Sequence, residues 1–211
     1  MTVQTAAAQI PYWVAVLTPE ERSFGSRRSD PRIDTISSSV VTNTRTQWAG
    51  PQHPSATTLL TALAATVGAW QSDRCRSCTS GVLVDIDGPG GQFFPVRLPC
   101  TGDAHSLLEE VRRRVAAAPN GGRDYAAAKY RLNSPALNRR SGAQISFRVG
   151  TEIEARGDDS LTHSLAVTCD VVEVDGVTMV DTAFRWNCRV FTRADVDDFE
   201  RFWEKTLAVF V

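Results

Sequence analysis

The sequence predicts an α/β protein, a two-layer sandwich in which helices cover mainly one face of a mixed sheet. The 211 residues suffice for one sizeable core, and apolar and charged shares of 42% and 22% are those of a globular domain. Some long segments have apolar residues at helical spacing, and β-branched runs lie between them. Because the two kinds of segment alternate, a sheet with helices packed on it fits best.

Helices are expected where apolar residues recur three or four positions apart. These segments are 57–70, 104–118, 125–132 and 193–209. Ser55 is the predicted N-cap of the first helix, and Thr192 with Asp195 forms a loose capping box before the last. A Pro-Asn-Gly-Gly run that starts at Pro119 ends the second helix.

Strands are expected at short runs of apolar and β-branched residues. These runs are 34–43, 81–88, 93–98, 144–149, 165–174 and 178–190. Asp175-Gly176 between the last two predicts a hairpin. Pro95 lacks an N–H, so its strand should pair imperfectly or lie at an edge of the sheet. We divide the chain into 1–22, a segment with a loosely ordered start at 1–9 and a linker-like helix, and a single domain at 23–211.

The charge balance excludes some classes of partner. The formal net charge is −1, so the concentrated positive field that nucleic acid or an acidic membrane attracts is missing. Two arginine-rich stretches, at 112–123 and 131–140, are interpreted as solvated faces. Because there is no leader-like segment and no apolar run near about 20 residues, we expect a cytoplasmic protein without a membrane span.

Five cysteines are an odd number for a disulfide framework. Cys75 and Cys78 form a C-x-x-C, but no second ligand pair completes a zinc site, and the surroundings differ from a thioredoxin-like redox motif. We interpret both as loop thiols. Cys100, Cys169 and Cys188 are interpreted as ordinary small apolar or half-exposed positions.

Few residues suggest chemistry on their own. Asp85 and Asp87 share one face of a strand, which would suit an acid or metal pair, but a strand end entering solvent is the favoured interpretation. His163 lies in a polar loop and is expected to be exposed. No G-x-S-x-G elbow or phosphate loop is present. Four of the five tryptophans are expected in the core or an interface: Trp13, Trp70, Trp186 and Trp203.

Six short motifs follow one another along the chain. Their sequences are YW at 12–13, TLLTAL at 58–63, VDIDGPG at 84–90, FFPVRL at 93–98, APNGGRDY at 118–125 and ISFRVG at 145–150. In this order they resemble the C-terminal half, or second lobe, of nonribosomal-peptide-synthetase condensation and epimerisation domains, with the epimerisation subtype nearer. The residues that carry the resemblance include Tyr12, Trp13, Phe94, Pro95, Arg97, Pro119, Asn120, Tyr125 and Phe147.

The resemblance implies a chloramphenicol-acetyltransferase-like half-domain and an active site between two lobes. The family's base is the second His of an H-H-x-x-x-D-G motif on the first lobe, but no two histidines of this chain are adjacent. The acidic residue of epimerisation domains falls on Asp87, whose carboxylate is set back by one methylene from that of a Glu. Pro89 stands in place of a family histidine.

The resemblance therefore implies a catalytically degenerate, stand-alone half-domain that acts by association with itself, a carrier protein or a peptide synthetase. The resemblance implies no cofactor bound by the chain itself. It does imply contact with the phosphopantetheine arm of a carrier protein. The alternative is half of a split active site, in which Asp87 works with a partner's histidine. A remnant or excised fragment without a separate role is the third interpretation. Because a free lobe exposes the seam between lobes, we expect an apolar patch and a homo-oligomer.

Overall fold

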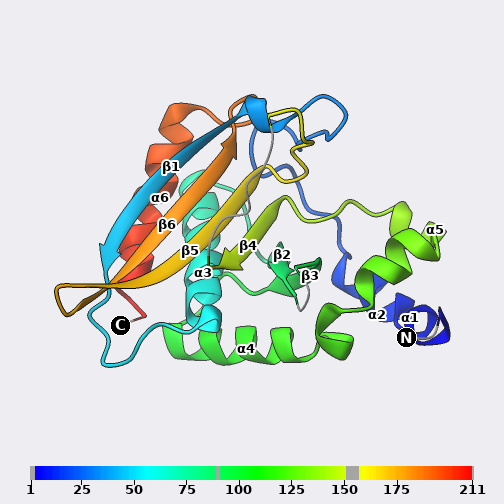
Figure 1. Cartoon of the computed structure of the whole chain (residues 1–211), viewed down its shortest axis with the longest axis horizontal. Helices are drawn as coiled ribbons and strands as arrows, with labels where there is room; N and C mark the ends of the chain where they lie inside the picture. The colour runs from blue at the N-terminus through cyan, green and yellow to red at the C-terminus, as the bar shows by residue number, and fades with distance from the viewer. Residues whose placement is uncertain (1–2, 89–90, 151–156, 211) are drawn as a thin grey trace.

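The computed structural model describes residues 3–88, 91–150 and 157–210. Within them, six strands form one sheet in the order β1-β6-β5-β4-β2-β3 (Figure 1). The strands are β1 (Ser39–Gln47), β2 (Val82–Asp87), β3 (Phe93–Leu98), β4 (Ile145–Val149), β5 (Leu165–Val174) and β6 (Val177–Asn187). The predicted mixed sheet is confirmed: β4 runs parallel to β2 and β5, and the other neighbours are antiparallel.

The two sequence signals for strand pairing are confirmed. β5 and β6 form a hairpin whose turn places Asp175 and Gly176 at φ values of 52° and 77°. Positive φ at both central residues is what the favoured two-residue hairpin turn requires. β3 lies at an edge of the sheet, where Pro95 pairs opposite Asp85 without having to donate to a further strand.

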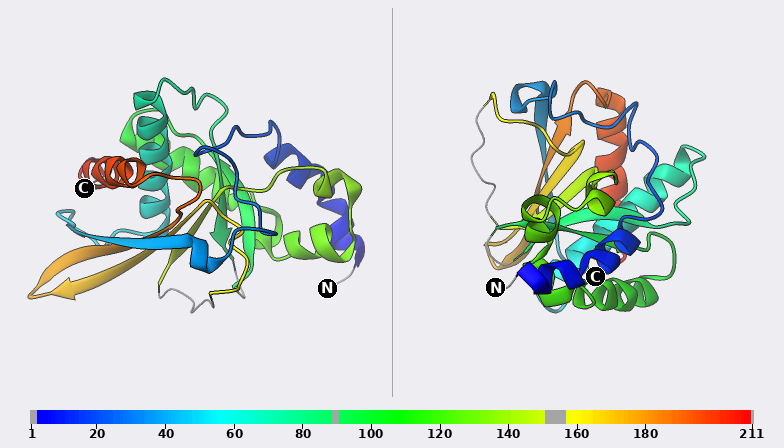
Figure 2. Two further views of the ribbon diagram at one scale, coloured as in Figure 1. Left: turned by 90° about the horizontal axis from the view of Figure 1, so that it is seen from above. Right: turned by 90° about the vertical axis from the view of Figure 1, so that its right-hand side faces the viewer.

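Three long helices cover one face of the sheet, which confirms the two-layer architecture (Figure 2). They are α3 (Ala56–Asp73), α4 (Ala104–Ala116) and α6 (Arg193–Leu207). The side chain of Ser55 accepts a hydrogen bond from the Thr58 N–H and caps α3 as predicted. Thr192 and Asp195 form the reciprocal capping box of α6. These caps satisfy amide groups that the helix itself leaves unpaired.

The core between α6 and the sheet is rich in aromatic rings. Phe199 contacts Phe184 at 6.0 Å and Trp186 at 5.2 Å between ring centroids. The indole N–H of Trp203 donates to Thr182 Oγ1 over 3.2 Å, so its polar atom is satisfied in the core. Each of the four tryptophans predicted to be buried is at most 1% exposed.

The N-terminal segment differs from the expectation of a loosely ordered start. Within it, α1 (Val3–Ala8) and α2 (Ile10–Val16) are helical. Ala6 is buried, and the Gln9 amide donates to Asp124 over 2.8 Å, so α1 is tied to a distant part of the chain. Trp13 of α2 belongs to the common core. The division at residue 22 stays a prediction.

The first predicted strand is shifted along the sequence. Residues Ile36–Ser38 form a 3-10 turn, η1, and β1 continues to Gln47. The turn is fixed by the Thr35 N–H, which donates to Ser38 Oγ, and by the buried Asp34 immediately before it. Such side-chain to backbone bonds compete with strand pairing, so β-branched composition alone did not locate the strand start.

The region between α4 and β4 contains short irregular helices. They are η2 (Pro119–Gly122), η3 (Ala127–Arg131), which is a π-helix, and α5 (Pro135–Asn138). The helix expected over 125–132 is therefore present as a π-type turn. α5, four residues long, was not predicted because such a segment carries no periodic signal.

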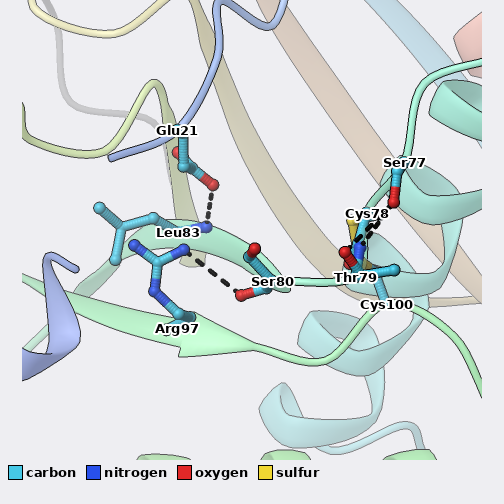
Figure 3. Close-up of a disulfide and its surroundings, with 8 residues drawn as sticks. All are labelled: Glu21, Ser77, Cys78, Thr79, Ser80, Leu83, Arg97 and Cys100. Atoms are coloured by element: carbon cyan, nitrogen blue, oxygen red, sulfur yellow. Dashed lines mark hydrogen bonds between the residues drawn. A yellow bond between two sulfur atoms is a disulfide. The ribbon is translucent and has the colours of Figure 1, made fainter. Parts of the chain in front are cut away.

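The interpretation of Cys78 and Cys100 as ordinary thiols is wrong, because they form a disulfide (Figure 3). The pairing of Val82 with Leu98 brings the start of β2 beside the end of β3, and the two cysteines lie just outside that pair. Their Cα atoms are 6.5 Å apart. Cys75 remains an exposed thiol, as predicted. The predicted cytoplasmic location stays a prediction.

A search of the described helices for a segment that is both long and apolar enough to cross a bilayer finds none.

Candidate functional site

The sheet has one face that the long helices do not cover, which we call the open face (Figure 2). Its side chains alternate with those that meet α6, and the strand registers align them in rows across the sheet. Most are polar or charged: Asn43, Arg45, Asp85, Ser146, Arg148, Thr168, Asp170, Asp181 and Arg185. The expected apolar seam is thus reduced on this face to scattered residues such as the partly exposed Val41.

Asp87, the predicted catalytic residue, lies at the end of β2. Its carboxylate forms an ion pair with Arg148 of β4, with 2.9 Å between Oδ2 and Nε. The Arg148 guanidinium also lies over the ring of Phe93, 5.3 Å from its centroid. These contacts hold Asp87 as a paired carboxylate beside a small pocket of about 290 Å³. Pro89 and Gly90 of the same motif lie outside the described residues.

Two expectations made for neighbouring residues are wrong. His163 was expected to be exposed, but its side chain is only 14% exposed and its Nε2 lies 2.9 Å from Asp85 Oδ2. Asp85 is accordingly not a solvated strand end, since its own side chain is 18% exposed. The ring of His163 also meets Phe93 edge-on at 5.8 Å. His163, from the loop just before β5, thus contacts residues of β2 and β3.

A pocket of about 680 Å³ opens beside this pair. Its walls come from β2, β3, the π-helix η3 and the loops before β4 and β5, and they include Asp85, Phe93, Tyr125, Lys129, Thr162 and His163. Burial, together with the nearby Asp85 carboxylate, raises the pKa of the Tyr125 hydroxyl far above its usual value. The Tyr125 hydroxyl is protonated at neutral pH, as in any ordinary tyrosine, and can donate there.

The residues that carry the family resemblance gather mainly around Trp13. Its ring lies 5.0 Å from Tyr125 and 6.3 Å from Phe94, between ring centroids. Tyr12 packs edge-on against the same indole. Gly122 is required here, because a Cβ at this position would lie 2.1 Å from the Phe94 ring. In this structure these motif residues build a packed junction between α2, β3 and the η2 turn.

The remaining motif residues also make structural contacts. Asn120 adopts a φ of 54° and donates to the buried Asp124 over 3.1 Å. Pro119, just before it, starts the η2 turn. Phe147 of β4 is buried in the core.

Arg97 ties the N-terminal segment to β3. It donates to the carbonyl oxygens of Val16 and Pro19 over 2.9 and 2.7 Å. Glu21, on the same segment, accepts from the Leu83 N–H of β2 over 2.5 Å (Figure 3). Burial raises the pKa of Glu21, and the Leu83 N–H and the positive charge of Arg97 oppose that shift. The predicted roles of the motif residues beyond packing stay predictions.

Among the described side chains, no three His, Cys, Asp or Glu residues gather as a metal site would need. The acid pair considered for Asp85 and Asp87 is instead divided between two basic partners, His163 and Arg148. Residues distant in sequence supply both partners. No local motif flags such contacts, so the sequence offered no signal beyond the two aspartates on one strand face.

The fold of this chain is similar to several solved structures. The chain is similar to the epimerization domain from the third module of tyrocidine synthetase B, at 15% identity and a TM-score of 0.71, over 99% of this chain and 57% of that one. The starter condensation domain of rhizomide synthetase RzmA matches at 13% identity and a TM-score of 0.67, over 98% and 52%. A chloramphenicol acetyltransferase matches at 15% identity and a TM-score of 0.54, over 84% and 91%. No protein-family model and no curated protein matches.

These likenesses establish the fold. The chain has the chloramphenicol-acetyltransferase-like fold of one half of a condensation or epimerisation domain, as the motifs predicted. Nearly its whole length aligns, yet it spans only about half of the synthetase domains it matches.

Proposed function

We propose that this chain is a half-domain of the condensation and epimerisation type that acts by association, with its open face as the interaction surface. The supporting observation is the one-sided coverage: 98–99% of this chain matches 52–57% of the two synthetase domains. The long helices do not cover the open face. The other half of a two-lobed domain would be needed to close a site there.

The chain alone is proposed to be inactive in condensation or epimerisation. Its sequence has no pair of adjacent histidines to supply the family's base. Asp87 is a weak candidate by itself, because its carboxylate is already held in an ion pair with Arg148. We propose no cofactor bound by this chain, and contact with a carrier protein's phosphopantetheine arm depends on the completed site.

A second copy is the proposed partner. Ion pairs such as Arg45–Asp181, with 2.6 Å between Nη2 and Oδ2, lie on the open face and can exchange partners across a two-fold interface. A polar and charged surface favours a reversible interface that depends on salt.

Light scattering at micromolar concentration tests this association. The wild type is expected to show a dimer whose mass falls at high salt. Val41→Arg places an additional charge on the open face and is expected to shift the protein to monomer. The matched control, Arg112→Glu, changes an exposed charge on α4 and should leave the mass unchanged. A wild type that stays monomeric at all salt concentrations would contradict self-association.

The split active site is the second candidate, supported by the position of Asp87 at the end of β2 on the family motif. A partner lobe that carries H-H-x-x-x-D-G would restore proton exchange at the α-carbon of a carrier-bound aminoacyl group. Asp87→Asn is expected to abolish that exchange in the reconstituted pair, and Asp170→Asn on the same face should not. Unaltered exchange with Asp87→Asn would remove this residue from the mechanism.

A further inference from the structure

The pocket beside β2 holds a hydroxyl, an imidazole and a carboxylate in a row. Nε2 of His163 lies 2.9 Å from Oδ2 of Asp85, and Nδ1 of the same ring lies 3.0 Å from Oγ1 of Thr162. Each ring nitrogen therefore has one polar partner. Asp85 comes from β2, whereas the other two residues come from the loop before β5. The fold thus joins groups that are far apart in the sequence.

The partners decide which ring nitrogen carries the proton. A carboxylate only accepts hydrogen bonds, so Asp85 holds a proton on Nε2 of His163. Nδ1 is then the acceptor, and the Thr162 hydroxyl is its donor. A hydroxyl bonded to an imidazole that a carboxylate orients is the arrangement by which enzymes activate an alcohol nucleophile.

The hydroxyl is the exposed member of the three, and the other two side chains are largely buried. Thr162 is exposed, so a ligand in the pocket can reach its oxygen. The side chains of His163 and Asp85 are 14% and 18% exposed, and the Phe93 ring shields the imidazole edge.

Two donors line the same pocket and can stabilise negative charge on a substrate oxygen. Tyr125 carries its hydroxyl proton at neutral pH as tyrosines ordinarily do, and burial together with Asp85 raises its pKa further. The Lys129 ammonium lies 5.6 Å from the Tyr125 ring centroid and 5.4 Å from that of Tyr130, which holds it at the pocket wall. Donors directed at a developing oxyanion are a large contribution to acyl-transfer catalysis.

We propose that Thr162, His163 and Asp85 form a nucleophilic relay that hydrolyses activated esters or thioesters bound in this pocket. Oγ of Thr162 attacks the acyl carbon while its proton passes to Nδ1 of His163. The bond to the leaving oxygen or sulfur breaks, and that atom takes the proton from His163. In the second step the imidazole of His163 takes a proton from a water molecule, whose oxygen attacks the acyl carbon on Thr162. The bond between that carbon and Oγ breaks, the acid leaves, and the imidazolium of His163 returns its proton to Oγ.

The pocket also indicates the substrate class. Phe93, Tyr125 and Tyr130 offer ring surface to an aryl or alkyl leaving group. A threonine hydroxyl is a weak nucleophile, so it reacts with acyl groups whose leaving group departs as a weak base, as phenolates and thiolates do. This activity is independent of the proposed function, because it requires no second lobe.

The test uses the purified full chain with p-nitrophenyl acetate. A burst of nitrophenolate is expected, and fragment-ion mass spectrometry after acid quenching should locate one acetyl group on Thr162. Thr162→Val should abolish both signals. His163→Gln should lower the burst rate about 100-fold, in the range that general-base catalysis supplies. His53→Gln is the control, because that exposed histidine pairs with Glu173 and lies outside the pocket lining, and it should leave the burst unchanged.

The position of the acetyl group in the wild-type protein tests the relay even if a variant unfolds. Acetylation of Lys129 or His53 in place of Thr162 would overturn the relay. A wild-type rate equal to that of the Thr162→Val protein would overturn it as well. Because the assay uses the chain alone, its failure leaves the light-scattering test of association unaffected.

Discussion

The two faces of the sheet use opposite chemistry on the same strands. The covered face carries rings such as Phe184 and Trp186, which pack on α6. The open face carries ion pairs such as Asp87–Arg148 and Arg45–Asp181. Because strand side chains alternate, one sequence supplies both faces. The difference indicates that the fold depends mainly on the covered face, and under the proposed function the open face is the surface that recognises a partner.

The largest expected effect comes from the covered face. Trp203→Ala removes a fully buried ring and its hydrogen bond to Thr182, so the free energy of unfolding should fall by about 3–5 kcal/mol. Thr168→Ala, on the open face, should change it by less than about 0.5 kcal/mol. Urea unfolding of both variants measures the contrast. Equal losses would mean that the open face also holds the fold together.

The disulfide lies on the side of the sheet that the long helices cover, so its loss adds to the contrast between the two faces. Gly68 of α3 approaches Cys100 so closely that a Cβ at Gly68 would lie 2.1 Å from the Cys100 carbonyl oxygen. The bond links positions 22 residues apart. The paired change of Cys78 and Cys100 to Ser should lower the free energy of unfolding by about 3 kcal/mol, as expected for loop closure of this length. Unfolding of the oxidised wild type with and without reductant provides the check, and no difference would contradict a formed bond.

The buried carboxylate of Asp34 is expected to have an effect of intermediate size on the free energy of unfolding. Arg27 donates to both oxygens of the buried Asp34, over 2.6 and 2.8 Å, and this pairing holds the pKa of Asp34 well below its ordinary 3.8. The folded state therefore gains stability above about pH 4 and loses it as the pH falls. Asp34→Asn should cost about 2 kcal/mol at pH 7, a reduced value because Arg27 is partly exposed. Its unfolding free energy should depend less on pH between 2 and 5; an unchanged profile would be the contrary result.

The smallest expected effect comes from an open-face ion pair. Asp181→Asn removes the partner of Arg45, whose side chain is 58% exposed. Exposed pairs contribute about 0–1 kcal/mol, so thermal unfolding should hardly change at low protein concentration. Under the proposed function the same change should weaken self-association. A large loss of stability with no change in association would reverse the assigned roles of the faces.

Much of the covered face was predictable from sequence. Helical spacing located α3, α4 and α6 to within a few residues, and Asp175-Gly176 located the β5–β6 hairpin. These signals are local: periodicity, caps and turn residues are read within one segment. The order of motifs predicted the fold that the solved structures share.

The open face was predictable only in part. Asp85 and Asp87 on one strand face were found, but their partners His163 and Arg148 were not. Contacts between residues far apart in sequence depend on sheet order and loop path, which no local pattern specifies. The Cys78–Cys100 bond was missed for the same reason, since the β2–β3 register creates it.

Carboxyl footprinting tests most directly whether the open face is covered by association. Asp170, exposed on β5, and Asp197, half-exposed on α6, are the paired probes. On dilution from micromolar to nanomolar protein, we expect carbodiimide labelling of Asp170 to rise several-fold while that of Asp197 stays constant. Labelling of Asp170 that is independent of concentration, in the presence or absence of salt, would contradict the account.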